Sequence, residues 1–231
     1  ISAIGSAICF DPITFAFFRF LGGVGIGIST IAAPAYISEI SASNERGKLV
    51  GYYQLNIVIG ILSAFVSNFF LKELGDSSWR LMVGVEAIPA IMYTIMIFYI
   101  SQSPRWIFLN GDISKSENLY EKLFSIEEKK VFLKEISKTK NEFQKNDSIF
   151  KNKYRFILYL AFMIAFFNQF SGINAFLYYS PRIFQEGGLG ENSAFLSSIG
   201  IGVTNLIFTI LGISLIDKVG RKVLMIIGSI G

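Results

Sequence analysis

The sequence predicts an all-α membrane protein, on two observations. Hydrophobic residues make up 52% of its 231 residues and aromatic residues 15%, and the mean hydropathy is positive, a composition that a soluble domain of this length could hardly keep in water. The apolar residues also gather in long runs that are almost free of charge. Each run reaches or exceeds the roughly 20 residues that a helix needs to cross a bilayer.

Each of these runs is expected to form one complete transmembrane helix, and they lie at 12–37, 49–71, 81–103, 156–181 and 192–216. Two further apolar stretches, 1–10 and 223–231, are too short to cross and are expected to be parts of other helices. The chain begins at Ile1 without a Met and stops inside an apolar run. We therefore expect both ends to be cut from a longer protein.

The composition argues against several kinds of function. His is absent and Cys9 is the only cysteine, so this stretch has no multi-cysteine metal site, no histidine base and no internal disulfide. The excess of Lys and Arg is typical of nucleic-acid binding, but here it lies between the spans, where membrane topology explains it better. We expect no enzymatic chemistry, no metal, no cofactor and no nucleic-acid partner.

Basic residues between the spans predict the orientation. The connections at 38–48, 104–155 and 217–222 hold seventeen Lys and Arg residues. The opposite connections hold three: Lys72, Arg80 and Arg182. Because cytoplasmic connections carry the excess of positive charge, the first set is expected to face the cytoplasm. The first complete span then runs inward.

Residues 104–155 divide the chain. We expect part of an N-terminal transmembrane bundle at 1–103, a cytoplasmic linker at 104–155, and part of a C-terminal transmembrane bundle at 156–231. Apolar residues recur at helical spacing in the linker, which predicts short amphipathic helices under the membrane; they are Leu119, Leu123, Phe124, Val131, Phe132 and Ile136. A solvated linker is the plainer interpretation, and a site for a regulatory partner is the alternative.

Amide side chains inside the spans are the candidate binding residues. A buried amide in hydrocarbon costs several kcal/mol unless it meets protein, water or a ligand. Amides donate and accept hydrogen bonds without charge, which suits a neutral polyhydroxylated ligand such as a sugar. Three of them cluster beside Ser171 and Gly172, a pair that favours a helix break, and this favours a ligand site over bonds between helices. The amides inside the spans include Gln54, Asn56, Asn168, Gln169, Asn174 and Asn205.

The segment QFSGINAFLYYSP, residues 169–181, resembles the seventh-helix signature of the sugar porter family within the major facilitator superfamily. RFLGGVGIGISTIAAPAYISEISASNERGKL is similar to the fourth helix and its cytoplasmic turn, SPRW to the end of the sixth, and DKVGRK to the turn after the eighth. The resemblance covers essentially the whole chain. It implies a partial major facilitator fold, from the end of helix three to the start of helix nine.

The resemblance also implies alternating access and binding of a hexose or pentose by five of these amides, Gln54, Asn168, Gln169, Asn174 and Asn205. Asn168 stands where the family pattern usually has the longer Gln, so it is expected to meet a different hydroxyl of the sugar. Tyr178 and Tyr179 correspond to the extracellular gate; an interfacial aromatic belt is the alternative.

Charged residues at the inner helix ends are expected to act as a cytoplasmic latch. Opposite charges in the two halves can pair when the cytoplasmic side of the transporter is closed. Such pairs favour the outward-facing state only if they are lost in the inward-facing state. The alternative is that these residues are ordinary juxtamembrane charges that follow the topology rule, although that rule does not explain the acidic Glu39. Gln102 replaces a Glu of the family pattern, which removes one ionic partner. The latch residues are Glu39, Arg46, Arg105, Asp217 and Arg221.

Arg19 and Glu86 are charges inside the spans, both roughly 10 Å below the outer surface, and we expect them to be partners. Similar residues occur in bacterial sugar–proton symporters, so the resemblance implies a role in proton coupling; a static pair that holds helices together is the alternative.

Gly23 and Gly27 form a small-xxx-small face that predicts close helix packing.

The sequence therefore predicts a multi-pass integral protein of the plasma (cell inner) membrane that transports a sugar with proton symport. Its expected partners are a monosaccharide, protons and the lipid bilayer. The alternatives are a facilitative uniporter, a membrane sugar sensor that does not transport, and a transporter of the same superfamily for a solute other than a sugar.

Overall fold

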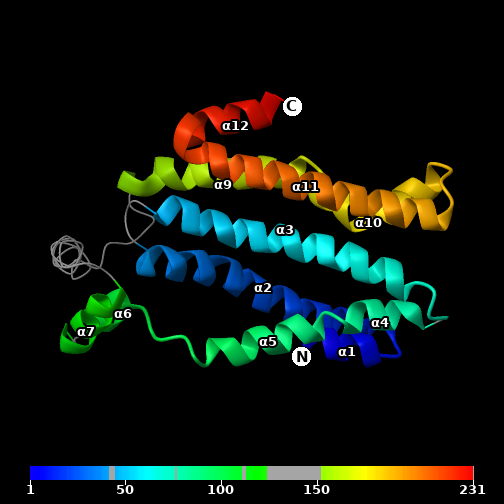
Figure 1. Ribbon diagram of the computed structural model, residues 1–231, viewed down its shortest axis with the longest axis horizontal. Helices are drawn as coiled ribbons and strands as arrows, with labels where there is room; N and C mark the ends of the chain where they lie inside the picture. The colour runs from blue at the N-terminus through cyan, green and yellow to red at the C-terminus, as the bar shows by residue number, and fades with distance from the viewer. Residues whose placement is uncertain (42–44, 76, 111–112, 124–151, 231) are drawn as a thin grey trace. The chain divides into compact units, whose positions relative to one another are not determined.

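The computed structural model describes residues 1–41, 45–75, 77–110, 113–123 and 152–230, and the regular elements within these residues are all helices (Figure 1). In chain order the helices are α1 (Ser2–Ile8), α2 (Pro12–Ile40), α3 (Arg46–Leu71), α4 (Ser78–Gly84), α5 (Ala87–Ile97), α6 (Pro104–Leu109), α7 (Ile113–Leu123), the short 3₁₀ helix η1 (Asn152–Tyr154), α9 (Arg155–Phe170), α10 (Ile173–Glu186), α11 (Glu191–Val219) and α12 (Arg221–Ile230).

Five helical segments of the described residues are long and apolar enough to cross a membrane: Pro12–Ile40, Arg46–Leu71, Ser78–Ile97, Arg155–Glu186 and Glu191–Ile216. The five predicted spans are confirmed in this sense. Very few of their residues are buried within the chain, and large apolar side chains such as Phe17, Phe20 and Ile31 are exposed. Such surfaces are stable against lipid or against further helices.

The span predicted at 81–103 differs from the observed one. It begins three residues earlier, breaks at Val85 and Glu86 between α4 and α5, and leaves the helix after Ile97. Pro89 falls in the first turn of α5, where its missing N–H is not needed, so the helix restarts there without loss. Pro104 restricts the residue before it to extended backbone, which keeps 101–103 out of the helix.

A second break divides the fourth span between α9 and α10. Gly172 has φ of +76°, in the left-handed region that favours glycine. The hydroxyl of Ser171 donates to the carbonyl oxygen of Asn168 at 2.7 Å and satisfies one acceptor at the end of α9. The break that the Ser-Gly pair predicts is confirmed.

The predicted linker begins with a small helical hairpin of α6 and α7. Ile107 and Phe108 are buried, and the buried Ser116 donates its hydroxyl proton to the carbonyl oxygen of Pro104 at 2.7 Å. Leu119 and Leu123 lie in α7, as predicted. The other apolar residues on which amphipathic helices were predicted, Phe124, Val131, Phe132 and Ile136, lie outside the described residues.

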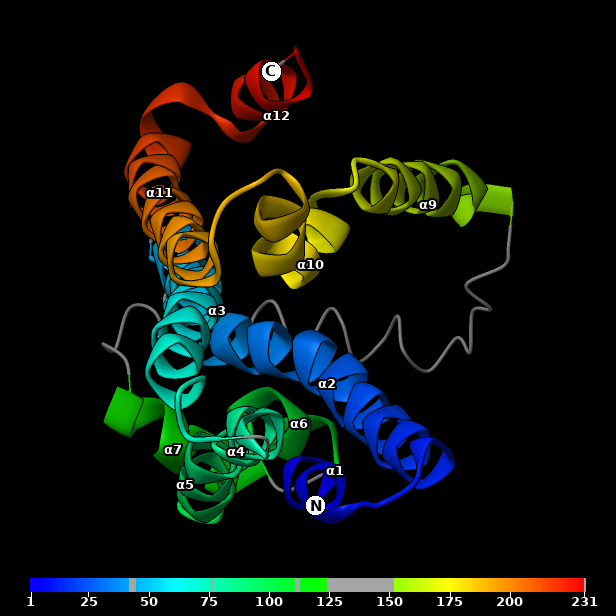
Figure 2. The same cartoon turned by 90° about the vertical axis from the view of Figure 1, so that its right-hand side faces the viewer.

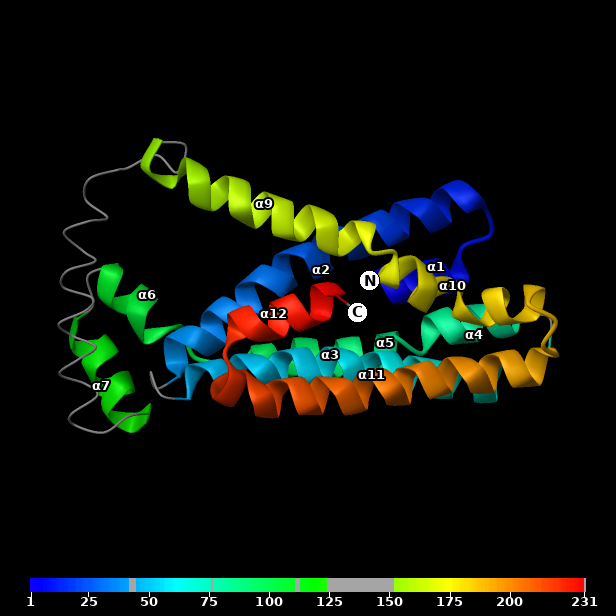
Figure 3. The same ribbon diagram turned by 90° about the horizontal axis from the view of Figure 1, so that it is seen from above.

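The chain forms two compact units, Ile1–Ser103 with Phe195–Gly231, and Pro104–Ala194. In the first unit α1 packs against α2 and α4, and α3 packs against α2 (Figure 2). Helices α3 and α11 also run beside each other and touch at Gly51 and Gly202 (Figure 3). The division into two bundles and a linker at 103 and 155 stays a prediction.

The close helix approach predicted at Gly23 and Gly27 is not observed. Among the described residues, a Cβ atom at either position would meet nothing within 4 Å. The close approach occurs one residue earlier, at Gly22, where a Cβ would lie 2.4 Å from the hydroxyl oxygen of Ser2 on α1. A glycine of this stretch does allow a close helix approach, but the packing of α1 against α2 determines which glycine it is.

Candidate functional site

Arg19 and Glu86 form an ion pair between α2 and the break that follows α4. Nη1 of Arg19 donates to Oε2 of Glu86 at 3.2 Å. The arginine side chain is 37% exposed and the glutamate side chain 53%. The expected partners are therefore in contact, while their role in proton coupling stays a prediction.

The ion pair lines a cavity of about 390 Å³ formed by α1, α2 and α5 together with Glu86. Its other lining residues include Ser2, Gly22 and Thr94, which are small or uncharged. The carboxylate of Glu86 therefore opens into the cavity on one side and contacts the guanidinium of Arg19 on the other. A carboxylate in such a place can exchange a proton and still have a cationic partner.

Two of the candidate amides meet across the break between α9 and α10. Nδ2 of Asn174 donates to Oε1 of Gln169 at 2.7 Å. The left-handed turn at Gly172 returns the chain so that two residues five positions apart face each other. Asn168 is exposed one residue before Gln169.

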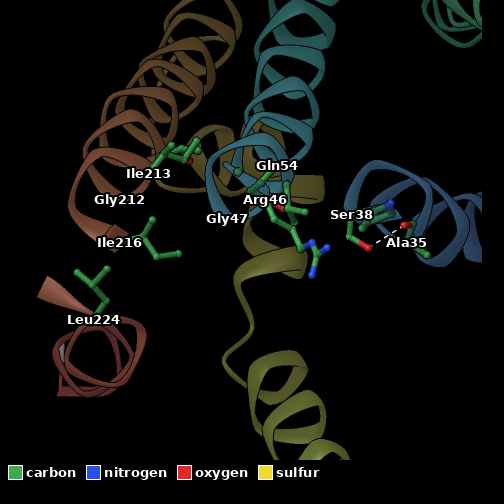
Figure 4. A pocket seen from close by; sticks show the side chains of 13 residues that line it. Ala35, Ser38, Arg46, Gly47, Gln54, Gly212, Ile213, Ile216 and Leu224 are labelled. Carbon is green, nitrogen blue, oxygen red and sulfur yellow. Dashed lines mark hydrogen bonds between the residues drawn. The ribbon is translucent and has the colours of Figure 1, made fainter. Parts of the chain in front are cut away.

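Gln54 lines a cavity of about 830 Å³ between α2, α3, α11 and α12 (Figure 4). This volume lies within the roughly 300–1,000 Å³ typical of small-molecule sites. The lining is mostly apolar, with a few polar side chains: Ser38, Arg46, Gln54 and Thr209. In Figure 4, α2 contributes Ser38 and α3 contributes Gln54 and Arg46, while Ile213 and Ile216 of α11 close the other side.

Asn205 is half-buried on α11 and is not among the residues that line this cavity. It lies four residues before Thr209 and seven before Gly212, which do line it. Residues at this spacing share one face of a helix, so Asn205 continues the face of α11 that borders the cavity. Gln54 and Asn205 belong to one compact unit and the other three amides to the second. That all five meet one ligand stays a prediction.

The expected gate residues Tyr178 and Tyr179 lie on α10, and both side chains are exposed. The latch residues lie at helix ends: Glu39 near the end of α2, Arg46 at the start of α3, Arg105 in α6, Asp217 near the end of α11 and Arg221 at the start of α12. The side chains of Asp217 and Arg221 lie outside the described residues. The gate and the latch stay predictions.

Sequence reasoning missed one polar residue with many contacts, Arg80 in the first turn of α4. It was counted only as a charge on the outer side. Its Nη1 donates to the carbonyl oxygens of Ala7 and Cys9, and its guanidinium lies over the rings of Phe10 and Trp79. The adjacent Trp79 was the available signal, because aromatic rings commonly hold arginine side chains.

Comparison with known proteins gives one family over the whole chain. Residues 1–231 match the family described as "Sugar (and other) transporter". The chain is 34% identical over 223 residues to the D-xylose-proton symporter of Escherichia coli (strain K12), covering 94% of this chain and 45% of that protein. It is 33% identical over 237 residues to the arabinose-proton symporter of Bacillus subtilis (strain 168), covering 99% of this chain and 51% of that protein.

The structural comparison agrees. The major facilitator superfamily proton:xylose symporter XylE, bound to 6-bromo-6-deoxy-D-glucose, superimposes with a TM-score of 0.86 at 31% identity, over 100% of this chain and 54% of that chain. The chain thus spans about half the length of the curated relatives that it matches.

Proposed function

We propose that this chain, which belongs to the sugar transporter family, is part of a membrane transporter that moves a sugar by alternating access, coupled to protons. The fold class predicted from the sequence, a partial major facilitator fold, is confirmed. The protein is a multi-pass protein of the plasma (cell inner) membrane. We propose that it moves its substrate without covalent chemistry.

The ion pair of Arg19 and Glu86 is the observation that carries the proposal of proton coupling. A charge inside a span is costly, and a pair that served only to hold helices could be replaced by apolar packing at little loss. Here the carboxylate instead opens into a cavity and is partnered by a guanidinium at 3.2 Å. Such a carboxylate can take a proton on one side of the membrane and release it on the other, as the protein changes state.

The candidate amides support a sugar as the substrate. The bond from Asn174 to Gln169 uses one donor and one acceptor, and leaves Nε2 of Gln169 and Oδ1 of Asn174 for a ligand. A sugar hydroxyl donates and accepts at once, so it can pair with both atoms. We propose that Gln54, Asn168, Gln169, Asn174 and Asn205 contact the sugar. Asn168, one methylene shorter than the usual Gln, then affects which sugar is preferred.

Two further sets of residues fit alternating access. We propose that Tyr178 and Tyr179 close the extracellular side of the pathway. We propose that the charged residues at the inner helix ends hold the cytoplasmic side shut in the outward-facing state; these are Glu39, Arg46, Arg105, Asp217 and Arg221. Both sets act only if their contacts differ between the two states.

The test is uptake of labelled hexoses and pentoses by vesicles that contain the full-length protein, with and without an imposed proton gradient. Glu86→Gln keeps the shape of the side chain and removes its titration. We expect this variant to lose gradient-driven accumulation, so that the sugar only equilibrates across the membrane, while exchange of sugar at equal concentrations continues. The matched control is Glu186→Gln, which removes an exposed carboxylate paired with Arg182 in the same helix at 3.0 Å.

Three outcomes would contradict the proposal in different ways. Equilibration that ignores the gradient would make the protein a uniporter and Glu86 a structural residue. Saturable sugar binding without uptake would make it a sensor. Uptake of a non-sugar solute alone would place it among the transporters for other solutes.

A further inference from the structure

Arg80 joins two helical segments that are far apart in the sequence. Its Nη1 donates to the carbonyl oxygen of Ala7 at 2.9 Å and to that of Cys9. These carbonyls lie at and just beyond the end of α1, where a helix has no internal donors left for its last oxygens. Unpaired carbonyls are costly in a membrane, and a cation is favourable at this end of a helix. Arg80 therefore satisfies the end of α1 from the first turn of α4.

Aromatic rings hold the guanidinium in place. Its central carbon lies 5.1 Å from the ring centroid of Phe10 and 4.6 Å from that of Trp79. The planar face of arginine stacks on such rings while its edge donates hydrogen bonds, which a lysine cannot reproduce. Close packing reinforces the link, since a Cβ at Gly84 of α4 would lie 3.3 Å from Cβ of Ala7.

A chain of contacts leads from Arg80 to the ion pair of Arg19 and Glu86. Trp79 meets Phe15 edge to face, with centroids 6.2 Å apart. The guanidinium of Arg19 lies 5.5 Å from the Phe15 ring and holds Glu86 at 3.2 Å. Glu86 lies two residues after the end of α4 and six residues after Arg80. Arg19 is thus connected to Arg80 through the rings of Phe15 and Trp79, and Glu86 is connected to it through α4.

We propose that Arg80 is a positioning residue for the Arg19–Glu86 pair, because it fastens α4 to the end of α1 and so fixes where Glu86 meets Arg19. This inference rests on the proposed function only for its effect on transport. Its structural part concerns the pair itself and can be measured without any uptake.

The first experiment compares Arg80→Ala with the wild type in the full-length protein. Cys9 is 7% exposed and follows the end of α1 that Arg80 holds, so its alkylation by N-ethylmaleimide reports on this contact. Dicyclohexylcarbodiimide adds to a protonated carboxyl in a membrane, but not to a carboxylate held by a guanidinium, so it reports on Glu86. Mass spectrometry of the two peptides reads both reactions. We expect each to be about tenfold faster in Arg80→Ala, since one charged hydrogen bond is worth about that factor or more.

The second experiment separates positioning from general stability. We expect Arg80→Ala to lose gradient-driven accumulation while sugar exchange at equal concentrations is largely kept, whereas general destabilisation would lower both together. Arg80→Lys keeps the charge but not the planar face, and its gradient-driven accumulation is expected to lie between those of the wild type and Arg80→Ala. The matched control is Arg182→Ala, another outer-side arginine, whose ion pair is exposed and within one helix.

Trp79→Leu provides a test if Arg80→Ala does not reach the membrane. It removes the ring contact with Phe15 and one of the two rings that hold the guanidinium, while Phe10 and the bonds from Arg80 to α1 remain. Cys9 is therefore expected to react more slowly than in Arg80→Ala, while Glu86 reacts faster than in the wild type. Unchanged reactivity of Cys9 and Glu86 in Arg80→Ala would overturn the proposal that Arg80 positions the pair. Faster reaction with unchanged accumulation would overturn the effect of that positioning on transport. A wild type that does not transport would contradict the proposed function, and the two labelling reactions would still decide whether Arg80 positions the pair.

Discussion

Asp11 shows how one side chain determines where a transmembrane helix begins. Its carboxylate accepts hydrogen bonds from the backbone N–H of Thr14 at 2.8 Å and from the Thr14 hydroxyl at 2.6 Å. Pro12 follows at the first helical position, where no N–H is needed. The bond from the Thr14 hydroxyl, followed by that from its N–H, lowers the pKa of Asp11 below its ordinary value of 3.8. The ionised cap is thus favoured by the folded helix.

This lowered pKa predicts a pH-dependent contribution to stability. A carboxyl whose pKa is lower in the folded chain stabilises the fold above its unfolded pKa, and the contribution is lost as the pH falls through the folded pKa. Thr14→Val removes the larger cause, so we expect the variant to be less stable than the wild type near neutral pH, and the difference to vanish below both pKa values. Thermal unfolding in detergent over a series of pH values measures it.

The control for this prediction is Thr30→Val. The Thr30 hydroxyl donates to the carbonyl oxygen of Gly27, which does not titrate. Its effect on stability is therefore expected to be the same at every pH. A pH-independent difference for Thr14→Val as well would show that Asp11 does not titrate with the helix cap.

At the scale of elements, the contact between α3 and α11 depends on two glycines. A Cβ at Gly51 would lie 3.2 Å from Ile213 side-chain carbons, and a Cβ at Gly202 would lie 3.0 Å from Cδ1 and 3.4 Å from Cα of Leu62. Glycine lets two helix backbones approach closely, which provides packing that lipid cannot. The two helices come from the two predicted bundles, so this contact joins the N-terminal and C-terminal parts of the chain.

Gly202→Leu is expected to force α3 and α11 apart, because the Leu62 backbone cannot move aside as a flexible side chain could. Overpacking of this kind commonly costs about 1–3 kcal/mol. We expect a lower unfolding temperature and slower uptake in vesicles. The matched control is Gly200→Leu, where a Cβ would meet nothing within 4 Å in the part of the chain that the structure describes, and near-normal stability is expected. Equal effects of the two substitutions would contradict a specific contact at Gly202.

At the scale of the whole molecule, the distribution of basic residues predicts which side faces the cytoplasm. The connection that holds α6 and α7 carries most of the positive charge, whereas the connection between α10 and α11 carries little. The two connections should therefore lie on opposite sides of the membrane.

Cysteines introduced at Asn118 in α7 and at Gly190 before α11 test this orientation. A maleimide that does not cross membranes is expected to label Gly190→Cys in intact cells, and Asn118→Cys only after the membrane is opened. Peptide mass spectrometry distinguishes these sites from Cys9, which serves as the buried reference. Labelling of Asn118→Cys in intact cells would reverse the predicted topology.

Different features of the fold were predictable to different degrees. The five spans follow from run length, and the break at Gly172 follows from residue type, because both depend on chemistry that is local in the chain. The break at Val85 and Glu86 was not predicted, since the apolar run continues through it. The pairing of Arg19 with Glu86 could be expected because two charges at equal depth have few other partners.

The sequence by itself determined that the chain lies in a membrane, where its spans are and to which family it belongs. It also determined which types of side chain are available for a sugar and a proton, because all of these depend on composition and on spacing along one chain. Only the tertiary structure decided which of these side chains touch. It selected Gly22 over Gly23 for the contact with α1, brought Asn174 to Gln169, and placed Arg80 between the end of α1 and Trp79. The physical reason is that such contacts depend on how each helix is rotated against its neighbours, and many side chains determine that rotation together.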